Sequence, residues 1–179
     1  LNFPLFGGSS IPFYFRKPEI DLDIDTPVKA SVVGSAGREE GGIFHAIDVL
    51  QSFVERRKGG ESGVQSVQCI HGPDVWKWTD QNPWAANLLD NIRTSFNFKP
   101  GHFQATVREP GATIIEYRDG TKGAVYAIND VGWTYAAEIV GRNDRQTRIG
   151  EDVLAFLDVR AFEADDERDR QIHFLRRGD

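Results

Sequence analysis

The stretch from Gly41 to Gly63 constrains the fold of this chain most strongly. Its apolar residues recur at helical spacing and fall within one broad arc of a helical wheel: Ile43, Ala46, Ile47, Val49, Leu50, Phe53 and Val54. Two glycines precede this stretch, and a basic turn, Arg56 to Lys58, followed by Gly59-Gly60, suits the end of a helix. The pattern predicts an amphipathic helix with one face on the core.

Strand-like segments flank this helix. Val28 to Gly34 precedes it and Val64 to Ile70 follows it, which matches the length of a strand–helix–strand crossover. In the second strand the register leaves open whether Val64, Val67 or Cys69 faces the interior. A lone cysteine inside a strand is typically a small buried apolar residue.

The second half of the chain changes to a strand-like period. Residues 113–117, 123–128 and 134–140 predict antiparallel strands, and Asp119-Gly120 suits a hairpin turn. Pro83 to Thr94 predicts a second helix, whereas residues 153–162 fit a strand or a helix equally well. The expected fold class is α+β, an open and mostly antiparallel β-sheet with helices packed on one face.

The composition suits a soluble protein with one core. With 179 residues, 40% of them hydrophobic and 27% charged, we expect an extended segment over 1–27, an α/β domain over 28–162 and a charged tail over 163–179. The net charge of −6 argues against nucleic acid or an anionic membrane as partner. A single cysteine and the lack of a signal peptide indicate a cytoplasmic protein. Because the chain has no methionine, we interpret it as a piece of a longer polypeptide.

His45 and Asp48 are the candidate catalytic pair. They lie three residues apart in the first turns of the expected helix, so their side chains reach the same region. The glycines before them let a ligand approach closely, and a carboxylate beside an imidazole fixes its tautomer. The pair could exchange a proton with a substrate hydroxyl, although a histidine at the polar margin of a helix also serves structure alone. The four histidines lack zinc-like spacing, so we expect no metal site.

Several segments resemble the C-terminal half of the glucose–fructose oxidoreductase / inositol dehydrogenase / MocA superfamily. The resemblance covers about Leu5 to Gly141 and is carried by FHAIDVLQ, VERRKGGESGVQSVQ, EYRDGTKGAV and YAAEIVG. It implies a substrate and oligomerisation domain that follows a Rossmann domain, with hydride transfer between NAD or NADP and a sugar or cyclitol hydroxyl. It also implies a homo-oligomer formed through the sheet face.

The resemblance assigns His45 as acid/base or substrate contact. In many members an aspartate lies four residues earlier, where this chain has Gly41, so Glu40 is a possible replacement. Trp76 and Trp78 are possible walls of the sugar site, or else core residues.

The glycine-rich dinucleotide motif and the catalytic Glu-Lys-Pro of the Rossmann half do not occur in this sequence. We therefore expect that this segment alone binds no NAD or NADP and is not a complete enzyme. The alternative is a non-catalytic binding or dimerisation module of the same fold.

Overall fold

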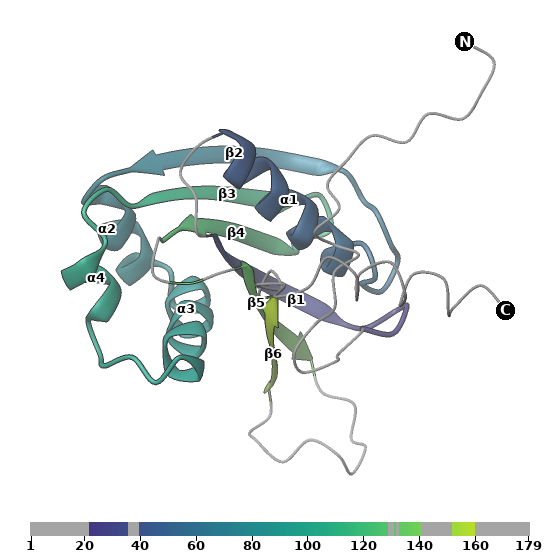
Figure 1. Cartoon of the computed structure of the whole chain (residues 1–179). Coiled ribbons are helices and arrows are strands. Elements are labelled where there is room, and N and C mark those ends of the chain that lie inside the picture. The colour runs from purple at the N-terminus through teal and green to yellow at the C-terminus, as the bar shows by residue number, and fades with distance from the viewer. Residues whose placement is uncertain (1–21, 36–39, 129–130, 132, 141–151, 160–179) are drawn as a thin grey trace, which may run out of the picture.

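The structure is a computed structural model of the 179-residue chain, and it describes residues 22–35, 40–128, 131, 133–140 and 152–159 (Figure 1). Only the backbone is described for Glu40, Gly41, Trp133, Val140 and residues 152–159. The elements are β1 (Val28–Ser35), α1 (Glu40–Val54), β2 (Val64–His71), α2 (Asp74–Gln81), α3 (Pro83–Ser95), α4 (His102–Thr106), β3 (Gly111–Tyr117), β4 (Lys122–Ala127), β5 (Trp133–Val140) and β6 (Asp152–Val159).

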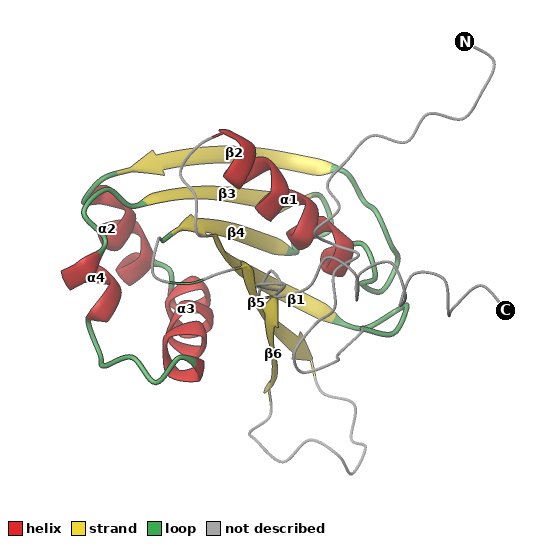
Figure 2. Cartoon of the chain, in the orientation of Figure 1, coloured by secondary structure: helices red, strands yellow, loops and turns green. Residues whose placement is uncertain are grey.

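The strands form one open sheet in the order β2-β3-β4-β1-β5-β6 (Figure 2). Neighbours pair antiparallel except β1 and β4, which run parallel. Since β2 reaches β4 through two antiparallel steps, β1 and β2 point the same way, and β1–α1–β2 is the expected crossover. The α+β class with a mostly antiparallel open sheet is therefore confirmed.

The helices cover both faces of the sheet, so the expectation of one covered face is wrong. Val33 of β1 belongs to a core that includes the buried side chains of α1. The preceding residue, Val32, belongs to a second core that includes residues of α2, α3 and α4. Successive side chains of a strand point to opposite faces, and all residues of β1 except Lys29 are buried. Such a strand needs a layer of cover on each side.

Helix α1 packs as its sequence pattern predicts. Ala46, Val49, Leu50, Phe53 and Val54 are all at most 1% exposed, and Ile47 packs at the margin of their core. Burying a side chain of the size of Leu50 or Phe53 contributes about 1.5–3 kcal/mol relative to leaving it exposed. Phe53 stacks on Tyr135 of β5, with 4.0 Å between the ring centroids. The helix is thereby fixed over the middle of the sheet.

The predicted hairpin and second helix are also present. Gly120 has φ +86° at the turn between β3 and β4, a conformation that glycine adopts without strain. Asp119 Oδ1 accepts the backbone N–H of Thr121 at 2.9 Å, which closes that turn. Helix α3 begins at Pro83 as expected, and the undecided segment near residue 153 forms strand β6.

Strand β2 lies at the edge of the sheet and not in its interior. All its residues are exposed except Ile70, which is half-buried. The expectation of a buried Val64, Val67 or Cys69 is therefore wrong, because in the described sheet β2 pairs only with β3 and the side chains of this edge strand stay accessible. Residues 1–21 and 163–179, the expected N-terminal segment and tail, lie outside the described residues.

Candidate functional site

Helix α1 holds His45 and Asp48 on neighbouring turns near its middle. Both side chains are half-buried, whereas the side chains that face the sheet, such as Leu50, are buried completely. The ring of His45 lies beside Phe44, with 5.5 Å between centroids and 59° between the ring planes. The imidazole is therefore not enclosed by the hydrocarbon core, and a ligand can reach this side of the helix.

Two acidic residues, Glu55 and Glu61, follow the end of α1. The pKa of Glu55 is raised, first because its carboxyl group loses hydration, and then because of the negative charges of Glu61 and Asp48; the charge of Arg57 acts in the opposite direction. The acidic side chains of Asp48, Glu55 and Glu61 therefore lie in one neighbourhood with the basic side chain of Arg57.

The structure describes the backbone of Glu40 but not its side chain. Glu40 is the first residue of α1, and Gly41 and Gly42 follow it within the helix. His45 is therefore five residues into α1, more than one turn from Glu40. The role of Glu40 stays a prediction.

Trp76 and Trp78 do not join His45. Both lie on α2 and pack against the core on the other face of the sheet from α1. Trp78 meets Trp84 of α3 edge to face, with 6.0 Å between ring centroids. A pair of tryptophans on this face cannot form the walls of a site around His45, so their assignment to that site is corrected.

A pocket of about 440 Å³ lies on this second face, between α3 and the strands β1 and β5. It is lined by Trp84, Asn87, Leu88, Asp90 and Asn91 from α3, together with Lys29 and Glu138 from the sheet. Trp84, Asn87, Leu88 and Asn91 are spaced so that they lie along one stripe of the helix, and Asp90 lies beside it. Lys29 Nζ donates to Glu138 Oε1 at 2.7 Å. An indole, two carboxamides and an ion pair are groups that can bind a polyhydroxylated ligand.

Sequence reasoning missed this pocket, although α3 carries a signal for it. Asn87 and Asn91 lie one turn apart and next to Leu88. A helix face that is fully buried carries apolar residues at such positions, so two asparagines there indicate a face that is partly open. The contribution of Lys29 and Glu138 had no local signal, because the two residues are 109 positions apart.

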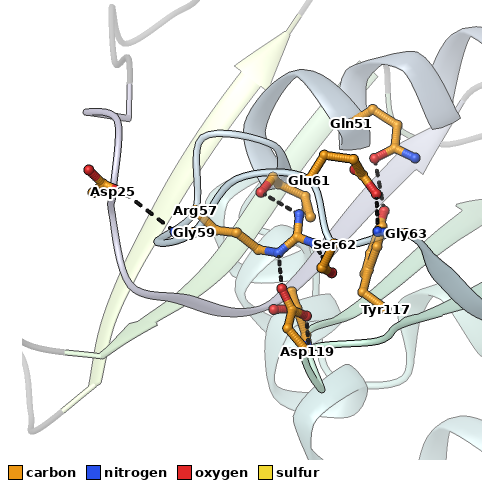
Figure 3. A network of polar contacts seen from close by, with 11 residues as sticks. Asp25, Gln51, Arg57, Gly59, Glu61, Ser62, Gly63, Tyr117 and Asp119 are labelled. Atoms are coloured by element: carbon orange, nitrogen blue, oxygen red, sulfur yellow. Dashed lines mark hydrogen bonds and ion pairs between the residues drawn. The ribbon is translucent and has the colours of Figure 1, made fainter.

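The second feature that the sequence did not reveal is a buried guanidinium at the end of α1 (Figure 3). Arg57 is 1% exposed and forms an ion pair from Nε to Asp119 Oδ2 at 2.6 Å. Its Nη1 donates to the carbonyl of Val54 at 3.0 Å and its Nη2 to Ser62 Oγ at 2.6 Å. The sequence predicted that the basic turn, Arg56 to Lys58, only stabilises the helix terminus. In the structure, Arg57 of this turn joins the end of α1 to the β3–β4 hairpin through Asp119.

The buried guanidinium of Arg57 affects the pKa values of the groups around it. Burial by itself would raise the pKa of Asp119, but hydrogen bonds from Arg57 and Thr121 outweigh it and lower this pKa to about 2. Arg57 also lies over the ring of Tyr117, 4.6 Å from its centroid. Burial raises the pKa of Tyr117 to about 12, so its hydroxyl stays protonated and donates to Gln51 Oε1 at 3.0 Å. The network is structural in character, since it is satisfied by the protein itself.

Comparison of the chain with protein-family models, with curated proteins and with solved structures finds no match. In the part of the chain that the structure describes, no group of three or more His, Cys, Asp or Glu side chains is placed to hold a metal ion. Within the same residues, no helix is long and apolar enough to cross a membrane.

Proposed function

We propose that this chain is the substrate-side domain of an NAD(P)-dependent oxidoreductase that acts on a hydroxyl group of a sugar or cyclitol, and that it is not catalytically complete alone. The observation that carries the proposal is the half-buried pair His45 and Asp48, one turn apart on the outer side of α1. A neutral imidazole can accept the proton of a substrate hydroxyl, and a neighbouring carboxylate stabilises the imidazolium that results.

Three of the segments that carry the family resemblance support the proposal because they pack together. FHAIDVLQ lies on α1, EYRDGTKGAV contains the turn of the β3–β4 hairpin, and Tyr135 to Val140 of YAAEIVG lie on β5. The ion pair between Arg57 and Asp119 links the end of α1 to that hairpin. The resemblance therefore falls on residues that position His45.

The dinucleotide does not fit this chain. The sequence has no GxGxxG turn to receive a pyrophosphate at a helix N-terminus. We therefore derive no step that uses NAD or NADP, and we assign its binding to a Rossmann partner domain. The part of this chain would be to bind the polyol and to exchange the hydroxyl proton at His45.

Binding of polyols to the chain tests this proposal. We expect a panel of cyclitols and hexoses to include a ligand that shifts the imidazole NMR signals of His45. His45→Ala should weaken its binding about tenfold or more, because one hydrogen bond to a charged or strongly polar group is lost. His71→Ala is the matched control, since His71 is exposed at the end of β2 and should leave affinity unchanged. Unchanged affinity for that ligand after His45→Ala would refute the assigned role.

The pocket beside α3 favours a second candidate, a non-catalytic polyol-binding module of the same fold. Its support is the stripe of Trp84, Asn87 and Asn91 opposite the Lys29–Glu138 ion pair. In this case His45→Ala would leave binding unchanged, whereas substitutions in the stripe would remove it.

A further inference from the structure

Strand β2 ends the described sheet on one side, and Figure 1 shows it at the outer edge. It is eight residues long and pairs with β3 along one side. Among the described residues no strand pairs with its other side. A strand in this position presents a row of backbone N–H and C=O groups to which another strand can bind.

From Ser66 onward this edge lacks the features that normally prevent strand pairing. Proteins protect long edge strands with charged residues, especially lysine, or with proline. The sequence of β2 is Val-Gln-Ser-Val-Gln-Cys-Ile-His, which contains none of these, although 27% of the whole chain is charged. A register shift between Val64 and Ser66 bends the first end of β2, and the rest of the strand is regular. The edge is therefore open for pairing from Ser66 onward.

Exposed apolar side chains gather at the same edge. Of the four large hydrophobic residues that are exposed in the described structure, Val64 and Val67 lie on β2, and they are 40% and 58% exposed. Val67 stands opposite Ile115 of β3, a residue of the core beneath α1, so Val67 extends that face of the sheet.

Another exposed hydrophobic residue, Phe44, lies on α1. It is 49% exposed and lies two helical turns before Gln51, on the same side of the helix. Gln51 accepts the hydroxyl of Tyr117 of β3, so this side of α1 faces β3 and the β2 edge beyond it. Phe44 is therefore an exposed apolar residue on the side of α1 that faces β3.

We propose that β2 pairs antiparallel with β2 of a second copy of this chain, which joins the two sheets into one. In a two-fold dimer both copies use the same surface, so a residue that contacts a second residue of the partner is contacted by that residue's copy in return. A residue on the axis contacts its own copy. A charged residue near that axis would face a like charge, and β2 contains none. We place the two-fold axis at Val67, so that the two valines face each other and Ser66 of each copy faces Gln68 of the other. This absence of charge favours a second copy over a partner of opposite charge.

The interface is small, because it consists of one strand and a few side chains. Interfaces of this size give reversible association. We expect a monomer–dimer equilibrium that depends on protein concentration. The proposal does not rest on the oxidoreductase hypothesis, since β2 carries none of the residues assigned to the polyol.

Sedimentation equilibrium of the whole chain tests the proposal. We expect the wild-type chain to form a dimer at high micromolar concentration. Val67→Lys should raise the dimer dissociation constant about tenfold or more, because two lysines would face each other across the axis. Ile24→Lys is the matched control: Ile24 is 76% exposed and lies outside β2, so its substitution should leave the dimer unchanged.

Disulfide formation gives a second test that does not depend on stability. Val67→Cys, made together with Cys69→Ser, places a single thiol near the proposed axis. Mild oxidation should give a covalent dimer, since directly opposite residues have Cβ atoms about 4.5–5.5 Å apart. A chain that remains monomeric at all concentrations, a dimer that Val67→Lys does not weaken, or growth into larger assemblies would overturn the proposal.

Discussion

The guanidinium of Arg57 lies at a place that solvent hardly reaches. Its side chain is 1% exposed, and the compensating carboxylate of Asp119 comes from the turn of a hairpin 62 residues later. Removing one partner of such a pair costs more than the pair itself contributes, because the other charge stays buried without compensation. Asp119 is 31% exposed, so water can screen part of this loss.

We expect Asp119→Asn to lower the free energy of unfolding by about 1–3 kcal/mol at neutral pH, since a buried charge loses its partner. The folded-state pKa of Asp119 is about 2, below its ordinary value of 3.8. A lowered pKa means that the stabilisation is complete above pH 3.8 and is lost as the pH falls toward about 2. The free energies of unfolding of wild type and variant, measured by urea denaturation, should therefore differ at neutral pH and become equal in acid.

Lys77→Gln is the control for this experiment. It removes the ion pair between Lys77 and Asp74, whose side chains are 72% and 70% exposed. Screened pairs of this kind contribute little to stability, so the variant should unfold like the wild type at every pH. If the free energy of unfolding of Asp119→Asn stays below that of the wild type by the same amount at low pH, the assigned role of the ionised carboxylate is contradicted.

At the scale of elements, α1 approaches the sheet closely where β4 has a glycine. A Cβ atom at Gly123 would lie 2.7 Å from Leu50 Cδ2, closer than real contacts allow. Leu50 is completely buried, so its side chain has little room to move. We expect Gly123→Ala to destabilise the fold by about 1–3 kcal/mol through overpacking, measured by urea denaturation.

Gly111→Ala on β3 is the matched control, because a Cβ there would meet Ala127 Cβ at an ordinary 3.5 Å. Combining Gly123→Ala with Leu50→Val should recover part of the loss, since the shorter side chain leaves room for the new methyl group. Equal destabilisation by both glycine substitutions would show that the contact with Leu50 is not the cause.

The elements that the sequence predicted are those whose signal is local. The burial of Leu50 and Phe53 follows from helical spacing, and the turn at Asp119-Gly120 follows from its residue types. The place of β2 at the edge could not be predicted, because Val67 has the same local pattern whether one or two strands flank it. The burial of Arg57 and the opposite faces of His45 and Trp78 likewise depend on contacts between distant segments.

At the scale of the whole molecule, the sheet separates two surfaces that could bind a polyol. His45 and Asp48 lie on α1 over one face, and the pocket with Asn91 lies beside α3 on the other. Substitutions on opposite faces of the sheet, when they lie more than about 7–10 Å apart, usually have independent effects. One ligand can therefore be assigned to one face by variants that leave the other intact.

We expect a polyol that stabilises the wild-type chain to act through the α1 face. At a hundredfold excess over its dissociation constant, a bound ligand adds about 2.7 kcal/mol of stability, which a thermal-shift experiment detects. His45→Ala should remove this shift, whereas Asn91→Ala should retain it, because the sheet lies between the two residues. If Asn91→Ala removes the shift and His45→Ala keeps it, the ligand binds the pocket beside α3, and the chain is a binding module without a role for the imidazole.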